Sequence, residues 1–237
     1  MFAKDGYGII FGTLFTFLLS LAVWYVFPHP VSLAATMLLG ALSVFNLFFF
    51  RDPERDIPKN ELAVVSPADG RVMEIKTVYE PEFFQKEVQR ISIFLSVFNV
   101  HVNRTPISGE VAYVMHRTGK FLAAFKEKAS LENEQTSIGM VDNYGHRVLF
   151  KQIAGLIARR IVCHLREGEW RKAGDRMGLI RYGSRVDIFL TIDAKVLVKS
   201  GQTVRGGESV LATFPSEGDY ASEEKRFVES PKTEIPG

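Results

Sequence analysis

The sequence is poor in the residues that build disulfide frameworks and metal centres. Cys163 is the one cysteine among 237 residues, which excludes an internal disulfide and fits a reducing compartment. It stands in an apolar stretch, where a nucleophilic thiol and a small buried side chain both fit the pattern. The five histidines share no ligand-like spacing. We therefore expect no metal site.

Phosphate-binding loops and strong charge are also missing. The sequence contains neither common form of Gly-rich phosphate loop and no repeat of solenoid type. Its 29 basic residues stand against 27 acidic ones, so the net charge is only +2. We expect no nucleic-acid partner.

Two runs near the N-terminus lack charged residues altogether. Residues 7–27 and 31–50 are apolar, and a Pro-His-Pro sequence separates them. Each run is long enough to cross a bilayer as a helix, and proline cannot continue a helix, so the pair predicts a transmembrane helical hairpin. A signal peptide or a buried soluble hairpin are the alternatives. Lys4 precedes the first run and Arg51 follows the second, which predicts a protein of the inner (plasma) membrane with its body on the cytoplasmic face.

The rest of the chain has the pattern of short strands between turns. We expect an anchor over residues 1–51, one β-rich domain over 52–214 and a disordered acidic tail over 215–237. A helix is expected over 120–129. The fold class is α+β, mainly β, with an antiparallel-rich domain. The expected strands span residues 62–65, 71–78, 91–95, 110–115, 136–142, 147–153, 156–165, 187–191 and 209–214.

Two segments of the body look alike. Residues 65–72 and 198–208 both resemble the half-motifs of biotinyl and lipoyl carrier domains and of membrane-fusion adaptors. A carrier needs an exposed lysine, usually flanked by methionines, and no Met-Lys-Met sequence occurs. A non-catalytic membrane adaptor with a carrier-like β domain therefore stands as the alternative to an enzyme.

The sequence GLIRYGSRVDIFL contains the bond between Gly183 and Ser184. Glycine leaves its carbonyl open to attack and serine carries a hydroxyl that can attack it, although a plain turn or bulge gives the same pattern. His101 ends an apolar strand, where it could transfer protons or serve as a structural side chain. Asp69 precedes a glycine and alone would be a turn residue.

The chain resembles the short prokaryotic class of phosphatidylserine decarboxylase proenzymes. The match covers about residues 48–214 and rests on long segments in a fixed order: FFFRDPER, SPADGRV, RISIFLSVFNVHVNRTPISGEV, GKFLAAFKEKAS, ENE and GLIRYGSRVDIFL. The resemblance implies self-cleavage between Gly183 and Ser184, with Ser184 becoming a pyruvoyl group. It also implies that Asp69 and His101 assist the cleavage.

This resemblance implies a lyase that makes phosphatidylethanolamine and CO₂ from phosphatidylserine. The pyruvoyl group at position 184 would form a Schiff base with the substrate amine, so neither pyridoxal phosphate nor a metal is needed. Arg104 stands where long-form enzymes have a second histidine. Its planar guanidinium could bind the lipid phosphate or carboxylate, or form a strand-end ion pair.

The implied partners are the lipid substrate, the surrounding membrane and the two chains left by cleavage. A homo-oligomer is also compatible with the sequence. Phe83 and Phe84, or Phe121 and Phe125, could dip into the lipid, and packing in the core is the alternative for all four.

The sequence predicts that the mature protein is two chains, residues 1–183 and 184–237. Denaturing electrophoresis and intact mass of the purified protein measure this directly. We expect Ser184→Ala to remain full length and inactive, because the attacking hydroxyl is gone. Normal processing of this variant, or an uncut wild-type chain, would contradict the assignment.

Overall fold

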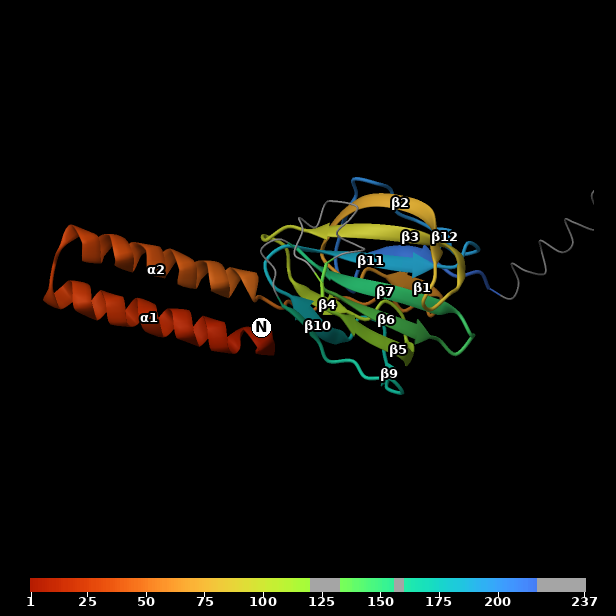
Figure 1. Cartoon of the computed structure of the whole chain (residues 1–237), viewed down its shortest axis with the longest axis horizontal. Helices are drawn as coiled ribbons and strands as arrows, with labels where there is room; N and C mark the ends of the chain where they lie inside the picture. The colour runs from red at the N-terminus through yellow and green to blue at the C-terminus, as the bar shows by residue number, and fades with distance from the viewer. Residues whose placement is uncertain (120–132, 156–159, 217–237) are drawn as a thin grey trace, which may run out of the picture.

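Two apolar helices extend from one end of a β domain (Figure 1). The computed structural model describes residues 1–119, 133–155 and 160–216. After a short 3-10 turn, Lys4–Gly6, helix α1 spans Tyr7–Val26 and α2 spans Pro30–Phe49. His29 caps α2, because its Nδ1 accepts the Val31 amide at 3.2 Å. The predicted hairpin is thus present, with its proline at the first position of α2.

The helices present their apolar side chains outward. Their most apolar windows are 6% and 17% buried, whereas the core helix of a soluble domain would be mostly covered. Length, composition and exposure together suggest that the hairpin associates with a membrane.

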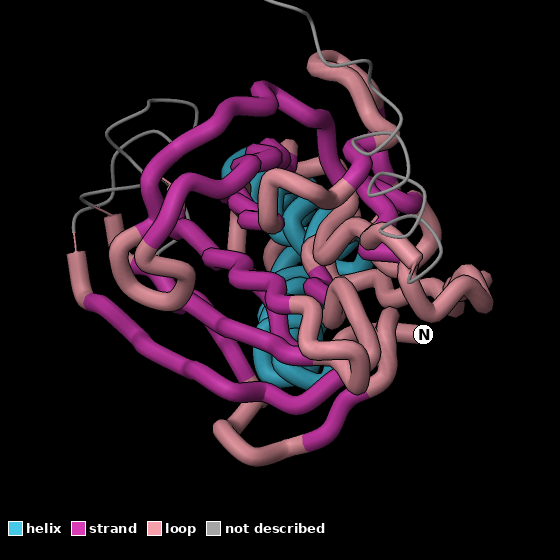
Figure 2. The backbone as a smooth tube through the Cα atoms, turned by 90° about the vertical axis from the view of Figure 1, so that its right-hand side faces the viewer, coloured by secondary structure: helices cyan, strands magenta, loops and turns pink. Residues whose placement is uncertain are grey.

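The β domain consists of antiparallel pairs in three sheets. The largest has the order β13-β2-β3-β11-β7-β6-β5-β9, and two three-stranded sheets have the orders β1-β14-β12 and β4-β10-β8. Figure 2, seen from the end opposite the helices, shows the strands curling around an interior. The strands are β1 (Ala63–Val65), β2 (Gly70–Glu80), β3 (Lys86–Leu95), β4 (Val102–Arg104), β5 (Gly109–Arg117), β6 (Gln135–Val141), β7 (Arg147–Ala154), β8 (Ile161–Cys163), β9 (Trp170–Arg171), β10 (Arg176–Ile180), β11 (Ser184–Leu190), β12 (Lys195–Val196), β13 (Thr203–Val204) and β14 (Val210–Thr213).

The mainly β fold with an N-terminal helical pair confirms the predicted fold class. The expected strands correspond to β1, β2, β3, β5, β6, β7, β11 and β14 within a few residues, and part of the expected strand 156–165 appears as β8. The expected helix at 120–129, including Phe121 and Phe125, and the tail from 217 onward lie outside the described residues. The division of the chain at residues 51 and 214 stays a prediction.

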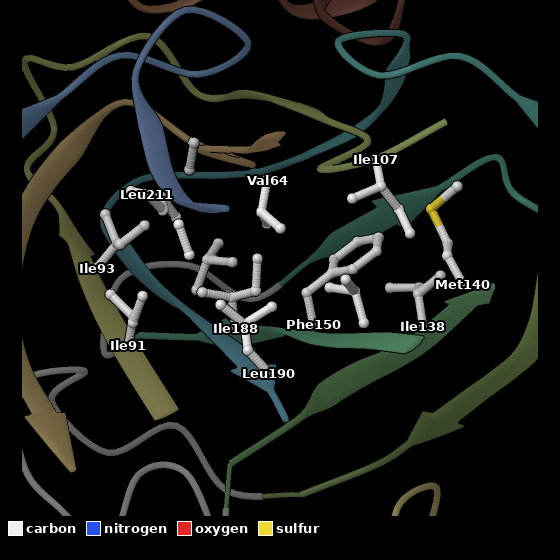
Figure 3. Packing of buried hydrophobic residues seen from close by; sticks show 14 of the residues in the cluster. Val64, Ile91, Ile93, Ile107, Ile138, Met140, Phe150, Ile188, Leu190 and Leu211 are labelled. Carbon is white, nitrogen blue, oxygen red and sulfur yellow. The ribbon is translucent and has the colours of Figure 1, made fainter. Parts of the chain in front are cut away.

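The main core lies inside the curled sheet. Strand β11 is its central element, because it pairs along its whole length with β3 on one side and β7 on the other. Alternate residues of these strands point inward and are fully buried. Figure 3 shows this packing around Val64, Ile91, Ile93, Phe150 and Ile188.

The two carrier-like segments lie side by side. Strand β13 pairs with β2 through Thr203 opposite Arg71 and Val204 opposite Gly70. The Gly207 amide donates to the Ser66 carbonyl at 2.8 Å. The similarity of the two segments thus corresponds to two strand-turn-strand units packed against each other.

Phe83 and Phe84 join β2 to β3 at the end of the sheet remote from Ser184. Phe84 is 6% exposed and packs in a small cluster with Val88, Leu149 and Phe189 on the outer side of the sheet. Phe83 packs edge-on against Phe84. The packing alternative therefore describes Phe84 better than insertion into lipid.

Truncation of a core side chain tests this packing. We expect Phe150→Ala, at a fully buried position, to lower the free energy of unfolding by about 3–5 kcal/mol, because a cavity replaces the ring. Tyr79→Ala, at a position 64% exposed, is the control and should cost less than about 1 kcal/mol. Chemical denaturation in detergent measures both, and equal losses would contradict the placement of Phe150.

Candidate active site

The bond between Gly183 and Ser184 lies where the turn after β10 enters β11. Tyr182 and Gly183 both have positive φ, at 57° and 77°. Glycine adopts this left-handed conformation freely, whereas a tyrosine rarely does. Ser184 is the first residue of β11, opposite Leu95 on β3 and Ala154 on β7. The pair is thus a turn, as the simpler interpretation predicts, and it sits at the start of the central strand.

Ser184 is fully buried and its hydroxyl has no hydrogen-bond partner within the described part of the chain. A buried hydroxyl without a partner costs about 1–3 kcal/mol. Native structures keep few such groups, and those they keep often have a functional reason. The serine that the sequence singles out is therefore held dry and unengaged beside a left-handed turn.

His101 is hydrogen-bonded to the backbone N–H of Gly183, one peptide before the Gly183–Ser184 bond. Its Nε2 accepts the Gly183 amide at 3.3 Å, so Nδ1 carries the proton and donates to the Asn99 carbonyl at 2.9 Å. Burial lowers the pKa of His101 to about 4, the Asn99 bond opposes this shift, and the charge of Arg51 adds to it. The ring is thus neutral, and its Nε2 accepts the N–H of the Tyr182–Gly183 peptide, next to the Gly183–Ser184 bond.

Asp69 makes its hydrogen bonds with residues other than His101 and Ser184. Its carboxylate forms an ion pair with Arg55 at 2.8 Å and accepts the Gly206 amide at 2.8 Å. Asp69 also raises the pKa of Arg51, against the lowering by burial, and Arg51 in turn lowers that of His101. Asp69 therefore ties Arg55 of the linker to the turn at Gly206, and none of its hydrogen bonds or ion pairs within the described residues reaches His101 or Ser184.

Arg104 is buried among backbone and carboxylate acceptors. Its guanidinium donates to Asp52 Oδ1 at 3.2 Å and to the carbonyls of Pro53 and Gly174 at 3.0 and 2.9 Å. Asp52 also pairs with Arg176 at 2.6 Å. Buried charges persist when they are paired in this way, and the contacts favour the ion-pair interpretation of Arg104 over a substrate contact.

The linker between α2 and the β domain, residues 51–55, makes ion pairs with the β domain that the sequence did not predict. Its Asp52 and Arg55 are the partners of Arg104 and Asp69, and its Glu54 pairs with Arg176 at 2.9 Å. The adjacent opposite charges Arg51-Asp52 and Glu54-Arg55 in the FFFRDPER segment were the available signal.

Sequence reasoning also missed a buried amide pair on the inner side of the sheet. Gln152 Nε2 donates to Asn103 Oδ1 at 2.8 Å. Asn103 Nδ2 and Gln152 Oε1 have no partner among the described residues. Gln152 lies two residues from Ala154 on β7, on the face that Ser184 shares. An unengaged hydrogen-bond donor is therefore present on the serine's side of the sheet.

Cys163 is half-buried on β8 and packs against the main core. Burial raises the pKa of its thiol, which disfavours the nucleophilic thiolate. The structure therefore favours the small-side-chain interpretation. In the three described ranges, no group of three or more His, Cys, Asp or Glu side chains is arranged to hold a metal ion.

Fold and site together define a mainly β protein with an exposed apolar helical pair and a buried serine beside a left-handed turn. Comparison with known proteins identifies the family to which the chain belongs. The family model described as phosphatidylserine decarboxylase matches residues 42–212, and the chain belongs to the phosphatidylserine decarboxylase family.

Three similar relatives all carry the name phosphatidylserine decarboxylase proenzyme. The protein of Symbiobacterium thermophilum is 46% identical over 198 residues, which cover 84% of this chain and 91% of that protein. That of Cytophaga hutchinsonii is 42% identical, covering 90% and 98%. That of Amoebophilus asiaticus is 44% identical, covering 90% and 96%. The similarity therefore spans nearly the whole of each protein.

The pKa of His101 predicts a pH dependence of stability. Its folded value of about 4 lies below the ordinary 6.5, so the unfolded chain takes up the proton first as pH falls. Stability contributed by neutral His101 is complete above about pH 6.5 and is lost toward pH 4, at about 1.4 kcal/mol per pH unit. Denaturation of wild type and His101→Gln between pH 7.5 and 4.5 measures this. Parallel pH curves for the two proteins would contradict it.

Proposed function

We propose that this protein converts phosphatidylserine to phosphatidylethanolamine and CO₂ with a pyruvoyl group that it makes from its own Ser184. Membership of the decarboxylase family supports the reaction, and the proenzyme names of the relatives support self-processing. The observation that carries the assignment of the site is the buried, unpartnered Ser184 hydroxyl beside the left-handed Gly183. A serine that becomes a pyruvoyl group needs a fixed backbone position and a hydroxyl that no hydrogen bond holds back from reaction.

The cleavage follows from the chemistry of the two residues. Ser184 Oγ bonds to the Gly183 carbonyl carbon, the peptide C–N bond breaks, and the proton passes to the Ser184 nitrogen. The resulting ester loses the Ser184 α-proton and expels the Gly183 carboxylate. Water then releases ammonia and leaves the pyruvoyl group at the new N-terminus.

His101 is the proposed base for this cleavage. It is neutral, buried and already hydrogen-bonded to Gly183, and it takes the Ser184 proton once Nε2 turns from the Gly183 amide. Asn103 offers the unengaged amide donor that an oxyanion at Gly183 requires. Asp69 supports the site indirectly, through its ion pair with Arg55 in the linker that follows α2.

The pyruvoyl group supplies an electron-withdrawing carbonyl to the substrate amine. The chain's own part is to keep that group in place after cleavage. Strand β11 pairs with β3 and β7 over seven residues each, so the chain that begins at position 184 stays bound to the chain that ends at 183.

The helical hairpin supports a lipid substrate, because it would keep the enzyme at the membrane surface where the lipid lies. A diacyl lipid leaves a bilayer at high cost, about 0.8 kcal/mol for each buried CH₂, so the enzyme has to act at the interface. Tyr182 contacts Phe49 at the end of α2 with ring centroids 4.6 Å apart. This contact supports a site at the foot of the hairpin, and the basic residues Lys4 and Arg51 support a location on the cytoplasmic face of the inner membrane.

A comparison of substrates tests this function. We expect the purified, processed protein in detergent micelles to release CO₂ from phosphatidylserine and at least tenfold less from free serine, because only the lipid is held at the interface. Ser184→Ala in the same micelles is the control and should release none. Release from free serine alone would overturn the lipid assignment, and equal release by Ser184→Ala would overturn the role of the pyruvoyl group.

A further inference from the structure

The last turn of α2 reaches the Gly183–Ser184 site directly. Phe49 is fully buried, and its ring lies 4.0 Å from the ring of His101 and 4.6 Å from that of Tyr182, centroid to centroid. The ring of Phe50 packs edge-to-face against that of Phe49, with the ring centroids 4.9 Å apart. An apolar helix end therefore forms the wall that keeps water from the histidine.

Asn46 lies one turn earlier on α2 and also faces the site. Only 2% of its surface is exposed, and its Oδ1 accepts the Tyr182 hydroxyl at 3.2 Å. A buried amide in an apolar helix is retained when its hydrogen bonds are made. Tyr182 carries the unusual φ of 57° immediately before Gly183, and such a conformation persists only when its surroundings enforce it.

The other buried polar residues of α2 serve a different contact. Thr36 donates to the Ser20 carbonyl and Ser43 to the Thr13 carbonyl, each at 3.0 Å. Both bonds tie α2 to α1 and touch neither His101 nor Tyr182. Asn46 is thus the member of this set whose side chain bonds to the β domain, and Ser43 offers a matched control on the same helix.

We propose that Asn46 and Phe49 are positioning residues, through which the membrane hairpin completes the site at Gly183–Ser184. Asn46 holds the Tyr182 turn in its left-handed form. Phe49 fixes and dries the ring of His101. This inference rests on the proposed self-cleavage, and it makes the hairpin a part of the reaction centre as well as an anchor.

Removal of the Asn46 contact tests the first role. In the full-length protein expressed in membranes, we expect Asn46→Ala and Tyr182→Phe each to slow the appearance of the two chains by about tenfold, because one hydrogen bond to the turn is lost. Asn46→Gln, which keeps an acceptor, should restore part of the rate. Ser43→Ala should process within about twofold of wild type, because it removes only a bond between the helices. Pulse-chase and denaturing electrophoresis give the rates.

A pH profile of processing tests the role of Phe49 independently of folding. Phe49→Leu keeps the junction apolar but exposes the ring of His101, so its pKa should rise from about 4 toward the ordinary value. The acid limb of the cleavage rate should then move to higher pH by about one unit or more. Arg51 and Tyr182 are the ionisable groups that this junction brings near the ring, and neither is altered in this variant. The acid limb of Ser43→Ala should coincide with that of wild type.

The outcomes separate this inference from the proposed function. A wild-type chain that never processes overturns both. A wild type that processes while Asn46→Ala and Tyr182→Phe keep its rate overturns the role of Asn46. An unmoved acid limb in Phe49→Leu overturns the role of Phe49. Equal slowing in Ser43→Ala and Asn46→Ala would show that general packing of the hairpin is responsible, which also overturns the inference.

Discussion

The packing of Phe49 against His101 and Tyr182, with the rings tilted by 33° and 31°, is the contact on which the proposed site depends. It joins the helical hairpin to the β domain beside the Gly183–Ser184 bond. Burial, to which this ring contributes, is the largest cause of the lowered pKa of His101. Under the proposed function, the end of α2 therefore belongs both to the hairpin and to the surroundings of the reacting bond.

Ion pairs of the linker and the pairing of strand β11 both stabilise this junction. The linker that follows α2 is fixed to the β domain by Asp52, which pairs with Arg104 and Arg176, and by Arg55, which pairs with Asp69. Mostly buried ion pairs of this kind add little net stability. Arrangements of the linker that separate the partners are strongly disfavoured, because a lone buried charge is costly. Strand β11, paired on both edges, gives position 184 a fixed place at the start of the central strand.

Local patterns predicted the elements well where burial is regular. Strands β2, β3, β6 and β7 alternate or run apolar over many residues, and the hairpin helices are long and uncharged, so their signals add along the chain. Short strands such as β4 and β9 have too few residues for a period to appear. The partners of Asp69 and Arg104 escaped prediction for another reason. Gly206 lies 137 positions from Asp69 and Asp52 lies 52 from Arg104, and no local pattern encodes contacts at such separations.

The sequence by itself determined the apolar hairpin, the mainly β body, the Gly-Ser pair and the histidine at the end of a strand, because each is a matter of composition and spacing along the chain. Only the tertiary structure decided that His101 touches Gly183 while Asp69 and Arg104 hold the linker. It also decided that α2 enters the site through Asn46 and Phe49. The physical reason is that burial and pairing are properties of residues brought together from distant parts of the chain.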